Sequence, residues 1–215
     1  SLEDLGVYSI ALTFARVWVE VSNRLNHTVL FPVLSRIQHD PPLLVAQSLR
    51  ARQAVLLGGG AIMTCFAIGA PLFFESLYDQ RYAGAGEVSR WLALYVWATI
   101  ILSSMERVPL ALGQPRALFI SNLITTAGYG LAVPGYQLAG LPGFIVALAV
   151  AQLAAHGALL AWVPVRRRAM LWQSALYSLA FGGYGLAAVA CMRMPVAGLP
   201  LAGRVAAAAA LCVPP

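Results

Sequence analysis

Long apolar blocks alternate with short polar segments along this chain. The blocks cover, approximately, residues 5–34, 54–78, 88–112, 117–138, 144–163, 172–192 and 196–213. Each block is long enough for an α-helix to cross a hydrocarbon core of roughly 30 Å. A helix also satisfies its own backbone hydrogen bonds, which lipid cannot do. The pattern therefore predicts an all-α fold, a polytopic membrane helix bundle with about seven transmembrane helices.

Proline and glycine mark the expected ends of these helices. Pro41 and Pro42 are expected to end the first helix, because a proline ring clashes with the preceding helical turn. Tight turns are expected at residues 113–116 (Gly-Gln-Pro-Arg) and 140–143 (Gly-Leu-Pro-Gly). The fifth block ends at Pro164, before a triplet of arginines. The predicted helices are thus joined by turns and loops, and the longest predicted loop covers residues 35–53.

The composition agrees with a membrane protein. Hydrophobic residues make up 60% of the chain and charged residues 10%, and the mean hydropathy is +0.76. Soluble domains carry roughly 25% charged residues, so a soluble fold is excluded. The net charge of +6 comes from arginines that are dispersed between the blocks. This dispersion argues against a nucleic-acid-binding face.

The arginines are segregated between the two sides of the predicted bundle. If seven spans alternate, one side carries Arg36, Arg50, Arg52, Arg116 and Arg166 to Arg168, and the other carries Arg81, Arg90 and Arg193. Basic residues concentrate on the cytoplasmic side of membrane proteins. The N-terminus is therefore expected on the periplasmic side and the C-terminus in the cytoplasm. Because an odd number of preceding spans would explain such an N-terminus, we expect the chain to be a C-terminal fragment.

The first block contains a polar stripe. Arg16, Glu20, Asn23, Arg24 and His27 are spaced by three or four residues, which places them on one helix face. A charge near the bilayer centre costs about 3 kcal/mol or more, so such residues usually face a cavity or the bundle interior. One interpretation is an anion-binding face, with both guanidinium groups held by Glu20. The alternative is that the charges form structural pairs at i and i+4.

Other polar groups within the blocks give weaker signals. Glu106 is either a cavity carboxylate or the partner of a nearby arginine. Interhelical hydrogen bonds are expected from Asn122, Thr125, Thr126, Gln152 and His156. The glycine run at residues 58–60 is interpreted as a point of close packing, and Cys65, Cys191 and Cys212 as small buried hydrophobic residues. No nucleophile motif and no metal-ligand spacing occurs, so neither an enzyme nor a cofactor is expected.

Four segments of the chain resemble a known family. They are Leu5 to Ala11 (LGVYSIA), Val29 to Ile37 (VLFPVLSRI), Leu77 to Ala85 (LYDQRYAGA) and Leu110 to Arg116 (LALGQPR). Together they resemble the oligosaccharide flippases of the polysaccharide and O-antigen export family, which share a superfamily with multidrug antiporters and lipid II flippases. The resemblance covers about residues 4–163 and begins at the helix that opens the second half of these transporters.

The resemblance carries implications for organisation. It implies that residues 1–163 form a second-lobe-like bundle of about five helices, and that residues 164–215 add two C-terminal helices. It further implies a multi-pass protein of the bacterial cytoplasmic membrane. A missing N-terminal lobe would complete the central cavity, so the chain is expected to be inactive alone.

The resemblance also implies a function. The expected cargo is an undecaprenyl-pyrophosphate-linked oligosaccharide, carried to the periplasmic leaflet during O-antigen, capsule or exopolysaccharide assembly. The expected partners are this lipid-linked oligosaccharide and membrane lipids. Alternatives are a drug or cation antiporter of the same superfamily and an intramembrane glycan polymerase or ligase. The arginines of the stripe disfavour a cation antiporter, whose cavity should offer carboxylates.

Overall fold

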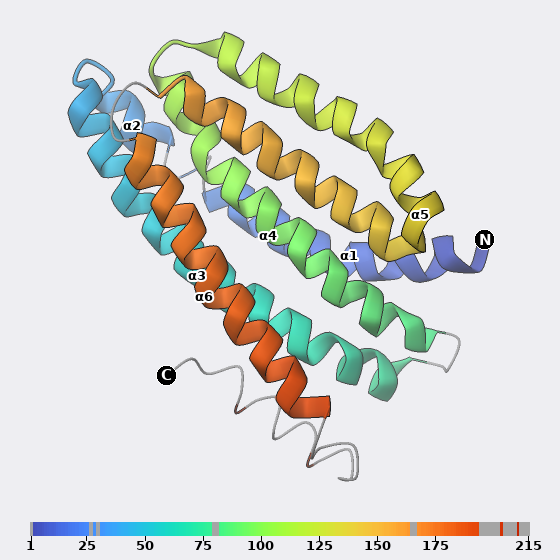
Figure 1. Cartoon of the computed structure of the whole chain (residues 1–215). Helices are drawn as coiled ribbons and strands as arrows, with labels where there is room; N and C mark the ends of the chain where they lie inside the picture. Colours follow the sequence, from blue (N-terminus) through green and yellow to red (C-terminus); the bar gives the residue numbers. More distant parts are fainter. Residues whose placement is uncertain are drawn as a thin grey trace.

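A computed structural model shows a bundle of helices (Figure 1). It describes residues 2–25, 28, 31–78, 82–163, 167–193, 203 and 210. The helices are α1 (Leu2–Leu25), α2 (Phe31–Arg36), α3 (Pro41–Leu77), α4 (Ala83–Ala111), α5 (Pro115–Ala161) and α6 (Arg167–Arg193). The described residues include no β-strand. The predicted all-α membrane helix bundle is therefore confirmed.

The long helix α5 is a hairpin of two legs. Its backbone leaves helical geometry at Ala139 and at Gly140, where φ is +63°, a conformation that favours glycine. The chain turns back there, and the legs 115–138 and 141–161 lie side by side (Figure 1). The turn and the two legs agree with the fourth and fifth predicted spans.

Glycines allow the two legs of α5 to approach closely. A Cβ atom added to Gly135 would lie 2.8 Å from the carbonyl oxygen of Gly143. Gly128 likewise faces the Cβ atom of Ala151 on the other leg. Small residues at such crossings let membrane helices gain van der Waals contact in the absence of a hydrophobic driving force.

Three helices in the described part of the chain are long and apolar enough to cross a membrane, judged by length and composition. They are α3, residues Gly84–Ala111 of α4, and α5, which contains two predicted spans. The first predicted span, about residues 5–34, is divided between α1 and α2. The seventh, about residues 196–213, lies outside the described residues except at positions 203 and 210.

The start of α3 corrects the sequence analysis. Pro41 and Pro42 begin this helix, although they were expected to end the preceding one. Proline suits the first helical turn, where its missing N–H would have no partner. The Asp40 side chain caps the helix by accepting a hydrogen bond of 3.0 Å from the backbone N–H of Leu43. The second span was predicted to begin near Ala54, but the helix begins 13 residues earlier, the difference between 54 and 41.

Helix α4 lies at the centre of the bundle (Figure 1). It packs against α1, α3 and α5, whereas α6 packs mainly against α3. One apolar core cluster gathers Leu34, Met105 and Leu159 around the α4–α5 turn. A second cluster gathers Ala11, Phe74 and Leu92 toward the other end of α4. The bundle therefore has two apolar cores with α4 passing through both.

Candidate functional site

The polar stripe of α1 faces away from the apolar core. Arg16, Glu20 and Arg24 are exposed and Asn23 is half-buried, whereas Ala11 and Ala15 on the opposite face are fully buried. Within the described part of the chain, no ion pair joins Glu20 to either arginine. The expected face therefore exists on α1, but without the structural ion pairs of the alternative interpretation.

Of the two remaining candidate residues, one falls outside the described part of the chain and one lies on another helix. His27 lies outside the described residues. Glu106 is half-buried on α4 and interacts within the fold, so it belongs to another helix. The candidate site that the structure assembles thus rests on α1 and on what surrounds Arg16.

Arg16 borders a pocket between three helices. The pocket has a volume of about 400 Å³ and is lined by Tyr8, Leu12, Arg16, Val19, Tyr95, Val96, Tyr129, Phe144 and Leu148. These residues come from α1, α4 and both legs of α5. We call this cavity the tyrosine pocket. It connects the polar face of α1 with the interior of the bundle.

Polar neighbours and ring contacts organise the tyrosine pocket. Tyr129 lies close to Tyr95 and to Gln152, a residue that is only 4% exposed. The rings of Tyr8 and Phe144 meet edge to face, with their centroids 5.8 Å apart. The interhelical hydrogen bond expected of Gln152 stays a prediction, and its polar neighbour Tyr129 lies on the other leg of α5. Sequence reasoning missed the tyrosines, because single aromatic residues in separate apolar blocks show no common pattern.

Arg52 is fully buried, which corrects its assignment to a loop. Its Nε donates a hydrogen bond of 2.9 Å to Ser104 Oγ of α4. Its Nη2 donates one of 2.7 Å to Ser174 Oγ of α6, and its Nη1 one of 3.0 Å to the carbonyl oxygen of Met170. The acceptors in these bonds are neutral. Three different nitrogens of the planar guanidinium group reach them, and a lysine side chain has only one nitrogen.

Further hydrogen bonds enlarge this junction to four helices. Ser174 Oγ shares a hydrogen bond of 3.1 Å with His156 Nε2 of α5. Gln173 Nε2 donates one of 3.1 Å to the carbonyl oxygen of Leu49 in α3. The interhelical bond expected of His156 is therefore confirmed. We call Arg52 with its partners the arginine junction, and it ties α3, α4, α5 and α6 together.

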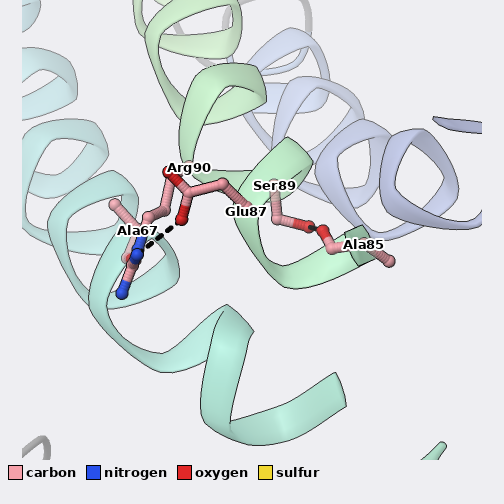
Figure 2. Close-up of polar contacts among 5 residues, drawn as sticks. All are labelled: Ala67, Ala85, Glu87, Ser89 and Arg90. Carbon is pink, nitrogen blue, oxygen red and sulfur yellow. Dashed lines mark hydrogen bonds and ion pairs between the residues drawn. The ribbon is translucent and has the colours of Figure 1, made fainter. Parts of the chain in front are cut away.

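Arg90 lies within α4, near the start of the third predicted block. Its Nη1 pairs with Glu87 Oε2 at 2.6 Å, and its Nε donates a 3.4 Å hydrogen bond to the carbonyl oxygen of Ala67 in α3 (Figure 2). That carbonyl lies four residues before Pro71, which has no N–H to satisfy it. Arg90 therefore supplies a donor that the proline removes from α3.

The close approach of α3 and α4 at this point depends on Gly86. A Cβ atom at Gly86 would lie 2.5 Å from the Cα atom of Pro71. One helical turn later, Arg90 reaches Ala67. A largely apolar cavity of about 410 Å³ opens beside this contact, between α3, α4 and α6.

The glycine run of α3 is a packing point, as expected. A Cβ atom at Gly59 would lie 3.2 Å from Ile100 in α4, and one at Gly60 would collide with the ring of Phe181 in α6. The run therefore brings both neighbouring helices close to the α3 backbone.

These features define an integral membrane protein of the helix-bundle class, with a charged face on one helix. Residues 1–87 match the model of a family described as polysaccharide biosynthesis protein. The matched segment contains α1, α2, α3 and the first residues of α4, and therefore the polar stripe. The predicted resemblance is confirmed for this segment, and it points to a role in polysaccharide synthesis or export. No curated protein and no solved structure matches the chain.

Proposed function

We propose that this protein is part of a flippase that moves a lipid-linked oligosaccharide across the bacterial cytoplasmic membrane. The observation that carries the proposal is the family match over residues 1–87, which includes an α1 helix with exposed Arg16, Glu20 and Arg24. Charged residues on a membrane helix require a watery or protein-lined surface. A translocation path for a polar glycan provides such a surface.

The proposed transporter has two lobes. Residues 1–163 contribute the second lobe and residues 164–215 the additional helices, while a first lobe covers the polar face of α1. The two lobes then enclose the cavity and alternate its access between the leaflets. Arg16 and Arg24 bind anionic groups of the cargo, since guanidinium groups recognise phosphate and carboxylate through paired hydrogen bonds. Glu20 and Asn23 lie on the same face as these arginines, and no covalent chemistry is required.

Complementation tests this proposal. The chain, together with any coding sequence that precedes it in its gene, is expressed in strains that lack a flippase, each with a different glycan. Restored surface glycan and cleared lipid-linked precursor are expected in at least one strain. If the protein inserts correctly and precursor still accumulates in every strain, the flippase function is wrong. Restored glycan without any change in precursor level would instead favour a polymerase or ligase.

The first variant to test is Arg16→Ala in the complementing protein. We expect glycan export to fall at least tenfold, because the cargo loses a charge-assisted hydrogen bond of about 1.5–3 kcal/mol. Arg50→Ala is the matched control, since Arg50 is also exposed but lies on α3. Membrane insertion is measured for both variants. Normal export by the inserted Arg16→Ala protein would remove Arg16 from the transport site.

A further inference from the structure

We infer that the tyrosine pocket binds one acidic sugar ring of the cargo, with the carboxylate at Arg16 and the ring among Tyr8, Tyr95 and Tyr129. This inference rests on the proposed function, because it names the part of the glycan that the pocket holds. Pockets of about 300–1,000 Å³ hold small molecules through apolar walls and a few converging polar groups. The cavity of about 400 Å³ beside Arg16 has both.

The charge of the pocket favours a carboxylate over the pyrophosphate. Arg16 is the one charged residue among the described residues that line it. A single guanidinium balances a single carboxylate, with which it forms two parallel hydrogen bonds. A pyrophosphate carries several negative charges, and desolvating those that remain unpaired within the bundle would be costly.

The walls of the pocket suit a sugar. Each tyrosine hydroxyl both donates and accepts hydrogen bonds, as sugar hydroxyls do. Tyr95 and Tyr129 line the pocket together, and the buried Gln152 lies close to Tyr129, so several polar groups converge on one ligand. The perpendicular rings of Tyr8 and Phe144 supply apolar surface for the C–H face of a sugar ring.

The location of the pocket agrees with a carried group. Arg16 lies near the middle of α1, Tyr95 near the middle of α4 and Tyr129 near the middle of the first leg of α5. The pocket extends from the middle of these helices to Phe144, about one helical turn after the turn of α5 at Gly140. Since the exposed face of α1 includes Arg16, the proposed path and the pocket meet at this residue.

A binding experiment with the purified chain in lipid nanodiscs tests the inference. Ligand-observed NMR compares methyl β-glucuronoside with the neutral methyl β-glucoside, and inorganic pyrophosphate serves as the competitor. We expect the glucuronoside to bind at least tenfold more tightly than the glucoside, and pyrophosphate not to displace it. This comparison requires no variant. Equal affinities, displacement by pyrophosphate, or no binding of either sugar would each overturn the inference.

Variants then locate the site. Arg16→Gln should remove the preference for the glucuronoside, whereas Tyr129→Phe should weaken both sugars about fivefold through the loss of one neutral hydrogen bond. Arg50→Gln is the control, because Arg50 is also exposed, lies on α3 and does not line the pocket. Circular dichroism establishes that each variant is folded. An unchanged preference in the folded Arg16→Gln variant would place the sugar elsewhere.

The two proposals can fail separately. If the glucuronoside binds as expected and no strain is complemented, the transport function is wrong and the sugar site remains. If export is restored and neither sugar binds, the sugar site is wrong and the flippase remains.

Discussion

Arg52 shows how a cation is accommodated inside this bundle. The guanidinium group is fully buried, and its hydrogen bonds go to hydroxyl, carbonyl and amide oxygens of α4 and α6. Ser104 and Ser174 also donate to carbonyl oxygens of their own helices, so each hydroxyl is both donor and acceptor. The charge is therefore solvated by hydroxyl groups, a backbone carbonyl and a side-chain amide oxygen in place of water.

This arrangement makes Arg52 sensitive to a change that keeps its charge. We expect Arg52→Lys to lower the free energy of unfolding by about 2 kcal/mol, because an ammonium cannot reach Ser104, Met170 and Ser174 together. The measurement is equilibrium unfolding of the purified protein in mixed detergent micelles. Arg50→Lys is the control, since Arg50 is exposed two positions earlier in α3. Equal stability of the two variants would show that the arginine junction adds nothing to the fold.

At the scale of the helices, the sequence predicted the apolar segments well and their polar extensions poorly. The turn at Gly140 and the stop at Gly113, where φ is +71°, follow from local glycine and proline chemistry. The first turns of α3 were missed because Gln47, Arg50 and Arg52 suggest a loop in water. Hydropathy cannot show that Arg52 is buried, since its partners lie 52 to 122 residues away in the chain.

The same limit applies to the candidate site. The stripe of Arg16, Glu20 and Arg24 was predicted because its residues recur at helical spacing within one segment of the chain. The tyrosine pocket was not found, because it requires knowing which faces of α1, α4 and α5 meet. Local spacing thus predicts the polar face of α1, whereas the tyrosine pocket can be found only from the tertiary arrangement.

The contact between α3 and α4 gives a prediction at this scale. We expect Gly86→Ala to destabilise the protein by about 2 kcal/mol, since the new methyl group would overlap the backbone at Pro71 and push the helices apart. Gly84→Ala is the matched control, because a Cβ atom there makes only an ordinary contact of 3.8 Å with Val7. Thermal unfolding in detergent compares the two. If both variants unfold at the wild-type temperature, Gly86 does not lie in close contact with the backbone of Pro71.

At the scale of the whole molecule, the exposed arginines mark one end of the bundle. Arg36 ends α2, Arg116 follows the start of α5, and Arg168 follows the start of α6. In Figure 1, the last residues of α2 and the first described residues of α5 and α6 lie at the same end of the bundle. By the preference of basic residues for the cytoplasmic side, we propose that this end faces the cytoplasm.

Cysteine labelling tests this orientation. In a protein without Cys65, Cys191 and Cys212, a cysteine at Ala83 should react with a membrane-impermeant maleimide added to intact spheroplasts. A cysteine at Arg168 should react only after the membrane is permeabilised. The opposite labelling pattern would show that the proposed topology is wrong and that the proposed cargo would enter from the other side.

The contact of Pro71, Gly86 and Arg90 has a consequence for how the sequence can change over time. The proline removes a donor from α3, the glycine admits α4, and the arginine replaces the donor. Loss of the proline alone would return the Ala67 carbonyl to its own helix and release Arg90 from its role, whereas Gly86 would still be needed beside the backbone of residue 71. Loss of the arginine alone would leave that carbonyl without a donor. Relatives of this protein should therefore replace Pro71 and Arg90 together, as a covarying pair across two helices, and keep a glycine at position 86 as long as α3 and α4 cross there.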